Sequence, residues 1–329
     1  MSHTCGLRHV ASLDFGGRPV CWGMNHEGAC SPPDVDMVQV SAGGLGASCG
    51  LTLRGQRVVC WGSDPVQGGP QGADADLEYT QVSVGGFHAC ALTAAEGRVV
   101  CWGKNYAGQA DPSAANRAAA RAGGFVQVSC GRDHSCGVGR DGLLRCWGAN
   151  ELGQAEAPHG QQFLQVSASL WRHTCGVTLG GAVLCFGHDG HGQSAPRGPG
   201  FDDPADANKN EKNDGENENE HEEAAPPAGK APQGGKRYTQ VSAGRLFTCA
   251  ITSGYELECW GDAGHAVSVI HRGVERAREG GVRYAQVSAG AHHACAARED
   301  GSKVDCWGVG EGRHTPRTAQ VPATFLPAV

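Results

Sequence analysis

The sequence predicts an all-β protein, a single seven-bladed β-propeller formed by residues 1–329. Three observations support this prediction. A Cys-aromatic-Gly motif occurs seven times, a Gln-Val motif recurs at intervals of 34 to 46 residues with one longer interval of 75, and glycine is frequent, at 52 of 329 residues. A period of this length in strand-like units is typical of propellers and solenoids, and glycine suits their many tight turns.

Residues 81–108, QVSVGGFHACALTAAEGRVVCWGKNYAG, illustrate the repeated unit. A first apolar run ends in a Gly-Gly turn, a second run surrounds Cys90, and a third run ends in Cys101-Trp102-Gly103. Short apolar alternations interrupted by glycine predict three antiparallel strands, and no helical period is present.

The same motifs mark each unit along the chain. The third strand ends in Cys-aromatic-Gly at 21–23, 60–62, 101–103, 146–148, 185–187, 259–261 and 306–308. The first strand carries Gln-Val-Ser beginning at Gln39, Gln81, Gln127, Gln165, Gln240 and Gln286, and an altered copy is Gln320-Val321-Pro322.

The two ends of the sequence favour a closed ring over an open solenoid. The sequence starts inside a unit, at His3-Thr4-Cys5, and a spare Gln320-Val321-Pro322 follows the last complete unit. We therefore expect the C-terminal strand to pair with the N-terminal blade, which would leave no exposed sheet edge. A solenoid would need capping units instead.

The longest interval between units contains an acidic insertion, residues 198–236. Between Gly198 and Gly229 ten acidic residues oppose two lysines, and apolar residues are almost absent. Such a composition cannot bury enough surface to offset the entropy of ordering, so we expect a flexible, solvated spacer. Binding of a cation or a partner is the alternative, although the carboxylates lack the spacing of a calcium-binding loop.

Charge and hydropathy exclude two classes of partner. Residues 198–229 of the insertion carry a charge of −8, and the net charge of the whole chain is −7, which leaves the rest of the chain near +1. A nearly neutral body offers no basic field for nucleic acid or an anionic membrane. No apolar run approaches the ~20 residues that span a bilayer. No signal peptide is visible, so we expect either a cytosolic protein or a sequence given without its leader.

The full repeat pattern resembles a known family. Val-Ser-Ala-Gly, two residues, His-x-Cys-Ala-Leu, a turn and Val-x-Cys-Trp-Gly-x-Asn-x-x-Gly are similar to the regulator of chromosome condensation repeat. The cysteines make it resemble a cysteine-bearing variety, similar to the ectodomains of crinkly-type receptor kinases. The resemblance covers essentially the whole chain except the insertion. It implies the propeller fold, but that fold carries exchange factors, inhibitors and receptor ectodomains alike.

Fourteen of the 16 cysteines form one pair in each unit. In six pairs the partners are 10 or 11 positions apart across a glycine-bearing turn, which places them on adjacent antiparallel strands, close enough for a disulfide. We expect seven disulfides and an oxidising compartment; reduced core cysteines in a cytosolic protein are the alternative. No CxxC spacing supports zinc. The pairs are Cys5/Cys21, Cys49/Cys60, Cys90/Cys101, Cys136/Cys146, Cys175/Cys185, Cys249/Cys259 and Cys295/Cys306.

Two cysteines are left over. Cys130 replaces a small residue of the first strand, which predicts an inert buried thiol. Cys30 lies in a Gly-Ala-Cys-Ser-Pro-Pro loop, where we expect it to be exposed and a candidate for an intermolecular bond.

The sequence contains no recognisable catalytic set. Five histidines stand two residues before the first cysteine of their unit, and a position that recurs with the repeat indicates a structural role better than a metal site. No Ser-His-Asp order, carboxylate pair or phosphate-binding loop is evident beyond the repeat glycines. We expect no enzyme activity, cofactor or metal. The five are His3, His88, His134, His173 and His293.

The turn between the first two strands varies from unit to unit, and all these turns should lie on one face of the ring. Trp171 is the only tryptophan outside the repeated motif. Tryptophan and arginine are enriched in interface hot spots, so these turns hold our candidates for partner binding, although an aromatic side chain here could also pack on its own blade. The candidates are Phe87, Arg132, Asp133, Trp171, Arg172, Arg245, Leu246 and His292.

These observations favour a non-enzymatic extracytoplasmic interaction or structural protein that presents one face to a protein or glycan partner, or to copies of itself. A cytosolic guanine-nucleotide exchange factor or chromatin adaptor is one alternative, against which stand the paired cysteines and the missing basic surface. A secreted propeller that inhibits an enzyme is another. The sequence contains no Asn-x-Ser/Thr sequon, so N-glycosylation cannot be used as support for secretion.

Overall fold

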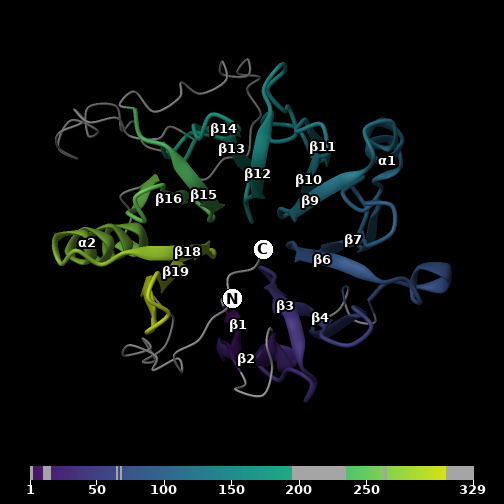
Figure 1. Cartoon of the computed structure of the whole chain (residues 1–329), viewed down its shortest axis with the longest axis horizontal. Helices are drawn as coiled ribbons and strands as arrows, with labels where there is room; N and C mark the ends of the chain where they lie inside the picture. Colours follow the sequence, from purple (N-terminus) through teal and green to yellow (C-terminus); the bar gives the residue numbers. More distant parts are fainter. Residues whose placement is uncertain are drawn as a thin grey trace, which may run out of the picture.

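The computed structural model describes residues 3–9, 16–63, 66, 69–194, 235–261 and 265–308. Its strands form seven units around a central axis, and the first strand of units 2 to 7 lies nearest the centre (Figure 1). Units 1 to 3 comprise β1 (His3–His9) and β2 (Gly17–Gly23); β3 (Met37–Ala42), β4 (Ala47–Thr52) and β5 (Val58–Gly62); and β6 (Tyr79–Val84), β7 (His88–Thr93) and β8 (Val99–Gly103). Units 4 and 5 comprise β9 (Phe125–Cys130), β10 (His134–Gly139) and β11 (Leu144–Gly148); and β12 (Phe163–Ala168), β13 (His173–Thr178) and β14 (Val183–Gly187). Units 6 and 7 comprise β15 (Tyr238–Ala243), β16 (Phe247–Thr252) and β17 (Leu257–Gly261); and β18 (Tyr284–Ala289), β19 (His293–Arg298) and β20 (Val304–Gly308).

The strands of units 2 to 7 pair antiparallel in chain order, which confirms the predicted all-β propeller class. Unit 1 contributes two described strands and joins unit 2 through one residue pair, Gly17 with Met37. The register sets the two cysteines of each unit directly opposite each other, as for Cys90 and Cys101. The predicted closing strand at 319–322 lies outside the described residues, as does nearly all of the acidic insertion.

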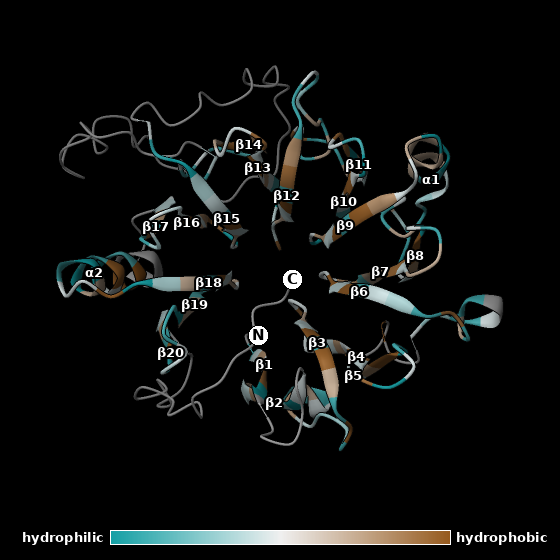
Figure 2. Cartoon of the chain, viewed as in Figure 1, coloured by the Kyte–Doolittle hydropathy of each residue, from teal (hydrophilic) through white to brown (hydrophobic). Residues whose placement is uncertain are grey.

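The apolar core is divided into clusters that lie between neighbouring units. Between units 3 and 4, for example, Leu92 and Val99 pack with Phe125 and Val128. Each fully buried side chain of this size contributes about 1.5–3 kcal/mol of transfer free energy. Figure 2 shows hydrophobic residues on inner strands such as β3, β9 and β12, while many of the connecting loops are hydrophilic. A cluster of this kind also lies at the junction of units 7 and 1, where Trp22 packs against apolar side chains of β19 and β20.

A large apolar residue starts the inner strand of units 2 to 7 and packs on a small residue of the middle strand. A Cβ added to Gly137 would lie 2.6 Å from Cδ1 of Phe125, and one added to Gly176 would meet Phe163 at the same distance. Both glycines therefore make room for an aromatic ring. The large residues are Met37, Tyr79, Phe125, Phe163, Tyr238 and Tyr284.

Histidine side chains tie consecutive units together, which supports the structural role expected for them. His88 Nε2 lies 2.6 Å from Ser135 Oγ, and that hydroxyl donates to the carbonyl of Gln109 at 3.1 Å. The hydroxyl therefore accepts from an Nε2–H, which defines a neutral tautomer. Equivalent ties join His3 to Ser48, His134 to Thr174, His173 to Thr248 and, between units 7 and 1, His293 to Thr4.

Within the described ranges, two α-helices and two 3-10 turns occupy connections between units: α1 (Ser113–Ala120), α2 (His265–Glu279), η1 (His26–Gly28) and η2 (Gly72–Asp74). The sequence pattern predicted strands and tight turns, and it did not reveal the 15-residue helix α2. Ile270, Val274 and Ala277 follow one helical face and pack into the core cluster between units 6 and 7, which includes Trp307.

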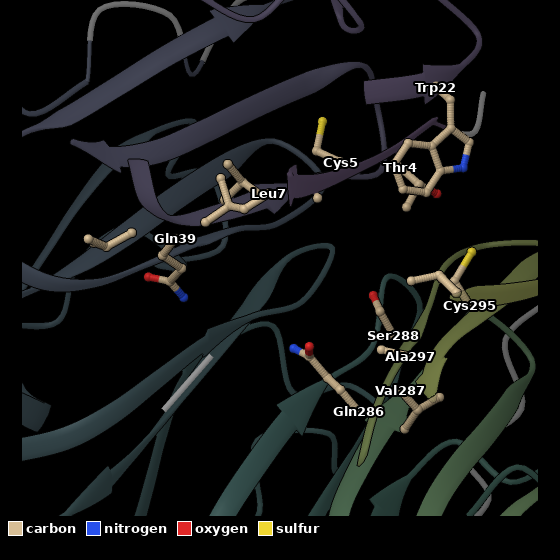
Figure 3. A pocket seen from close by; sticks show the side chains of 14 residues that line it. Thr4, Cys5, Leu7, Trp22, Gln39, Gln286, Val287, Ser288, Cys295 and Ala297 are labelled. Atoms are coloured by element: carbon tan, nitrogen blue, oxygen red, sulfur yellow. The ribbon is translucent and has the colours of Figure 1, made fainter. Parts of the chain in front are cut away.

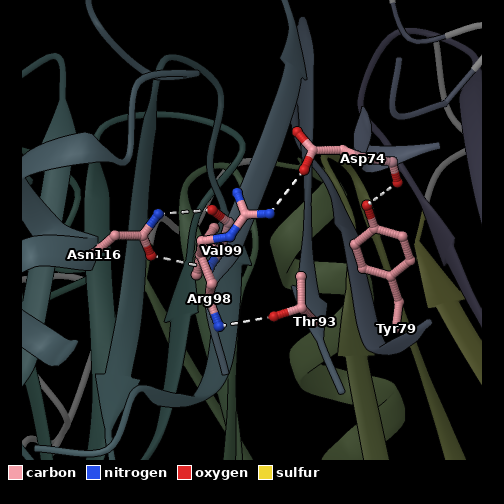
Figure 4. A network of polar contacts seen from close by, with 6 residues as sticks. All are labelled: Asp74, Tyr79, Thr93, Arg98, Val99 and Asn116. Atoms are coloured by element: carbon pink, nitrogen blue, oxygen red, sulfur yellow. Dashed lines mark hydrogen bonds and ion pairs between the residues drawn. The ribbon is translucent and has the colours of Figure 1, made fainter. Parts of the chain in front are cut away.

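Polar contacts hold the outer connections against the blades (Figure 4). The Asn116 amide of α1 accepts from the Val99 amide N–H at 2.9 Å and donates to the Val99 carbonyl at 2.8 Å. Arg98 pairs with Asp74 at 2.7 Å, and the Tyr79 hydroxyl donates to the Asp74 carbonyl. These contacts fix η2 and α1 on opposite sides of unit 3. In the part of the chain that is described, no helix is long and apolar enough to cross a membrane.

Candidate interaction surface

In units 2 to 5 the turns between inner and middle strands form one continuous face, because their backbones are hydrogen-bonded from unit to unit. Gly44 N–H donates to the Gly85 carbonyl at 3.3 Å, and Gly86 N–H donates to the Gly131 carbonyl at 3.0 Å. Arg132 N–H continues the series to Ser169 at 3.1 Å. The side chains of these turns therefore project from a rigid support, as a preorganised binding surface requires.

Trp171 is the centre of this face. The guanidinium carbon of Arg245 lies 4.7 Å from the indole centroid, that of Arg132 lies at 5.1 Å and that of Arg172 at 5.7 Å. All three separations are within the range of cation–π attraction, which contributes about 0.5–1 kcal/mol at exposed sites. The indole is thus held by arginines from units 4, 5 and 6.

The contacts continue on both sides of Trp171. Arg132 also lies 6.0 Å from the Phe87 ring, which Lys104 approaches at 5.0 Å and Tyr106 meets edge-on at 6.2 Å. On the other side, Arg245 Nη1 lies 3.4 Å from His292 Nε2. We call this set the cation–aromatic arc; it comprises Phe87, Lys104, Tyr106, Arg132, Asp133, Trp171, Arg172, Arg245 and His292.

The arc is positively charged, although the body of the chain is nearly neutral. Its four lysine and arginine side chains oppose one carboxylate, Asp133, which pairs with Arg132 Nε at 3.3 Å and accepts the Tyr106 hydroxyl. Loss of solvation, together with that hydrogen bond, raises the pKa of Tyr106 to about 12, so the phenol stays neutral and adds no negative charge at physiological pH. The arc can therefore attract an anionic group that also offers apolar surface.

The structure brings together seven of the eight predicted partner-binding residues. Leu246 is the exception: it is half-buried, and among the described residues no ring contact or ion pair connects it to the others. Sequence reasoning missed Lys104 and Tyr106, which follow the third strand of unit 3. The sequence signal for these two residues was their place at variable positions of Trp-Gly-x-Asn-x-x-Gly. This segment is held against the turn because Lys104 N–H donates a hydrogen bond to the Phe87 carbonyl at 2.9 Å.

All seven predicted disulfides are present, and each joins the middle strand of its unit to the outer strand. The second cysteine of each pair, on the outer strand, is half-buried in six units and buried at Cys185. No bridge belongs to the cation–aromatic arc, so the cysteines hold the blades together and are not part of the candidate interaction surface. The bridges are Cys5–Cys21, Cys49–Cys60, Cys90–Cys101, Cys136–Cys146, Cys175–Cys185, Cys249–Cys259 and Cys295–Cys306.

The two remaining cysteines, Cys30 and Cys130, are free. Cys130 is buried as expected, and desolvation raises the pKa of its thiol to about 12. Cys30 is only partly exposed, because its loop folds back so that its N–H bonds to Asn25 and its thiol lies 3.5 Å from the Met24 carbonyl.

One group of potential metal-binding atoms is found among the described residues, with His88, Cys90 and Cys130 within 4.8 Å of one another. Cys90 is bonded to Cys101, so its sulfur cannot act as a thiolate ligand. Two buried ligand atoms remain, which is fewer than the three or four that a zinc site uses.

The repeat profile named regulator of chromosome condensation (RCC1) repeat matches residues 79–109, 125–154, 163–193 and 284–311. These ranges coincide with units 3, 4, 5 and 7. Four of the seven units therefore match the regulator of chromosome condensation repeat. In each matched range, the repeat begins at the inner strand and extends beyond the Cys-aromatic-Gly motif, as the sequence pattern had indicated.

Solved structures share the propeller fold. The ectodomain of the receptor kinase CR4 from Physcomitrella patens is 22% identical, with a TM-score of 0.62 over 93% of this chain and 70% of that one. The ectodomain of ACR4 from Arabidopsis thaliana is 21% identical, with a TM-score of 0.62 over 94% and 91%. Prp20p from Saccharomyces cerevisiae is 15% identical, with a TM-score of 0.61 over 90% and 79%. At these identities the similarity establishes the fold.

Proposed function

We propose that this protein is a non-enzymatic, extracytoplasmic interaction protein whose cation–aromatic arc binds an acidic segment of a protein partner. The observation that carries the proposal is the approach of three arginines to one indole, with Asp133 as the carboxylate of the arc. A guanidinium stacked on a ring keeps its in-plane N–H groups available, and these bind carboxylates in bidentate fashion.

The disulfides support the extracytoplasmic part of the proposal. Seven bridges in one chain suit an oxidising compartment, and the two receptor-kinase propellers of similar fold are ectodomains. Prp20p has the same fold and binds Gsp1p and histones. An exchange factor or chromatin adaptor is the weaker candidate because reducing compartments disfavour a disulfide in every unit.

A protein ligand is favoured over a glycan by the aromatic content of the arc. Phe87, Tyr106 and Trp171 offer apolar and edge contacts that suit aromatic or aliphatic side chains beside the carboxylates. We expect an extended acidic segment containing aromatic residues to follow the arc from unit 3 to unit 7.

The test is fluorescence anisotropy with a labelled peptide of alternating glutamate and tyrosine, compared with a peptide that has glutamine for glutamate. The full chain should bind the acidic peptide, and Trp171→Ala should weaken binding at least about tenfold. Arg283→Ala is the matched control, since Arg283 lies 4.8 Å from the Tyr255 ring and belongs to a cation–π pair away from the arc.

Equal binding of the glutamine peptide, or equal loss in the Arg283→Ala control, would contradict the proposal. If a heparin oligosaccharide binds and the acidic peptide does not, the ligand of the arc is a glycan and the proposed protein ligand is wrong. Binding should also weaken with added salt, because exposed charges are screened over about 10 Å at 0.1 M.

A further inference from the structure

The arginines of the cation–aromatic arc carry more positive charge than the described carboxylates beside them offset. Arg132 pairs with Asp133 at 3.3 Å. Arg172 and Arg245 form no ion pair with a carboxylate in the described part of the chain. The polar partner of Arg245 is His292, at 3.4 Å, and an imidazole carries no negative charge in either protonation state. Two of the three guanidinium charges are therefore available to a ligand.

The loops next to these arginines do not supply the missing negative charge. The loop after β14 is held beside Arg172, whose carbonyl accepts the His188 N–H at 2.7 Å. The carboxylate of this loop, Asp189, accepts a backbone N–H of the same loop at 2.8 Å. In the corresponding loop of unit 4, Glu151 accepts from a glutamine side chain of its own loop at 3.3 Å. Both carboxylates are thus bound locally, and neither pairs with an arginine of the arc.

The number of guanidinium groups favours one shape of anion. All three guanidinium carbons lie within 5.7 Å of the Trp171 indole centroid, so one ligand group beside this indole can contact more than one of them. A carboxylate has two oxygens, which a single guanidinium satisfies in bidentate fashion. A sulfate or phosphate ester has three terminal oxygens in a tetrahedral arrangement, and these accept from several donors at different angles. Arginines from units 4, 5 and 6 therefore suit a tetrahedral oxyanion better than one carboxylate.

The aromatic side chains of the arc indicate what carries the oxyanion. Arg132 lies between two rings, 5.1 Å from the Trp171 centroid and 6.0 Å from the Phe87 centroid. Among the described ring contacts, Arg172 and Arg245 each approach one ring, that of Trp171. A guanidinium that faces one ring can stack on a second ring with its opposite face. An aryl ester joins a ring and an oxyanion in one side chain, so both of its parts find partners here.

The cavity at the junction of units 7 and 1 does not compete for such a ligand. It has a volume of about 150 Å³, and Gln39 and Gln286 extend into it from opposite walls (Figure 3). None of its 14 lining residues is a lysine or an arginine. An oxyanion in this cavity would lose hydration without gaining a cationic partner. The arc is the better site of the two.

We propose that the arc binds an aromatic ester of a tetrahedral oxyanion, a sulfotyrosine or phosphotyrosine side chain of the protein partner. This inference rests on the proposed function and names the group that the arc recognises. Arg172 and Arg245 donate N–H groups to the terminal oxygens, and the ring of the ester packs on their guanidinium groups. The two esters share this chemistry and differ in charge, since a phosphate ester carries about −1.5 to −2 at pH 7 and a sulfate ester a single negative charge.

Fluorescence anisotropy with the full chain and four labelled peptides tests the proposal. The parent peptide alternates glutamate and tyrosine, and in the other three one central tyrosine is replaced by sulfotyrosine, phosphotyrosine or glutamate. The sulfated or the phosphorylated peptide should bind at least about tenfold more tightly than the parent, because new charge-assisted hydrogen bonds form. The added glutamate should strengthen binding at most about threefold, as exposed ion pairs do.

Arg245→Lys separates the geometry of recognition from charge. Lysine keeps the positive charge but lacks the planar fork, so the affinity ratio between modified and parent peptides should fall to about threefold or less. Arg283→Lys is the matched control, because Arg283 lies 4.8 Å from the Tyr255 ring and outside the arc. This control should leave the affinity ratio unchanged.

The outcomes distinguish this inference from the proposed function. Preference for the sulfated peptide assigns a sulfate ester, and preference for the phosphorylated peptide assigns a phosphate ester. A modified peptide that binds when the parent does not would support the inference and contradict the proposed carboxylate ligand. Equal affinity for modified and parent peptides, or an equal gain from the added glutamate, would overturn the inference and leave the proposed function in place. If no peptide binds, both are wrong.

Discussion

Replacing one buried histidine should remove a defined share of the acid sensitivity of the protein. His173 is fully buried, and its pKa is lowered to about 3 by burial and then by the nearby His134 and His188. In the unfolded chain the imidazole titrates near 6.5. Below that pH the unfolded state binds a proton that the folded state does not, so stability falls as pH falls from 6.5 toward 3.

The magnitude follows from the two pKa values. At pH 5 the unfolded imidazole is mostly protonated and the folded one is not, which costs about 2 kcal/mol relative to pH 7.5. For a chain of this size the cost corresponds to a decrease of about 4 °C in melting temperature. His88 and His134, whose pKa values are lowered to about 3 and about 4, should each add a similar amount.

The assay is the melting temperature at pH 7.5 and pH 5 for the unaltered chain and for His173→Gln, which retains a donor for Thr248. The decrease between the two pH values should be smaller by about 4 °C in the variant. The exposed His159, changed to glutamine, is the control and should leave the decrease unchanged. If His173→Gln loses as much stability in acid as the unaltered chain, His173 is not held neutral in the folded state and the reasoning fails.

Three further outcomes are expected. Alkylation of the denatured, unreduced protein should label only Cys30 and Cys130, and ten or more labelled thiols would contradict the disulfides. Deletion of residues 202–223 should leave the melting temperature nearly unchanged, whereas a decrease of ~10 °C would show that the insertion packs. Truncation before Thr318 should cause aggregation and a large loss of stability; a monomeric truncated chain with an unchanged melting temperature would rule out closure by the C-terminal strand.

The sequence predicted the features that repeat. Strand order and cysteine pairing follow from motif spacing alone, because residues opposed across a hairpin are fixed by the turn between them. The arc was only partly predicted, since the proximity of Lys104 to Phe87 depends on how the segment after β8 folds back. Helix α2 was not predicted, although Ile270, Val274 and Ala277 recur at helical spacing and pack on the core.

In the histidine ties, the residue at the histidine position of one unit correlates with the residue at the hydroxyl position of the next unit. Five units have a histidine at the first position of the middle strand, and the following unit then has serine or threonine at the second position. The two units without this histidine have Ala47 and Phe247, and the units that follow them have Ala89 and Ala294 at the second position. A buried hydroxyl or imidazole without its partner costs about 1–3 kcal/mol, which explains why the two positions change together.

That explanation predicts a strong coupling between His88 and Ser135. His88→Phe with Ser135→Ala reproduces the pair found as Phe247 and Ala294, and the Gln109 carbonyl keeps its bond from Trp147 Nε1 at 2.9 Å. Ser135→Ala alone removes the hydrogen-bond acceptor of the buried His88 Nε2–H. The Nδ1 of the same ring already lacks a partner among the described residues. The double variant should therefore be more stable than the sum of the two single changes by about 1–2 kcal/mol, measured by denaturant unfolding. Additivity within about 0.5 kcal/mol would mean that the tie contributes only packing, and that the correlation has another cause.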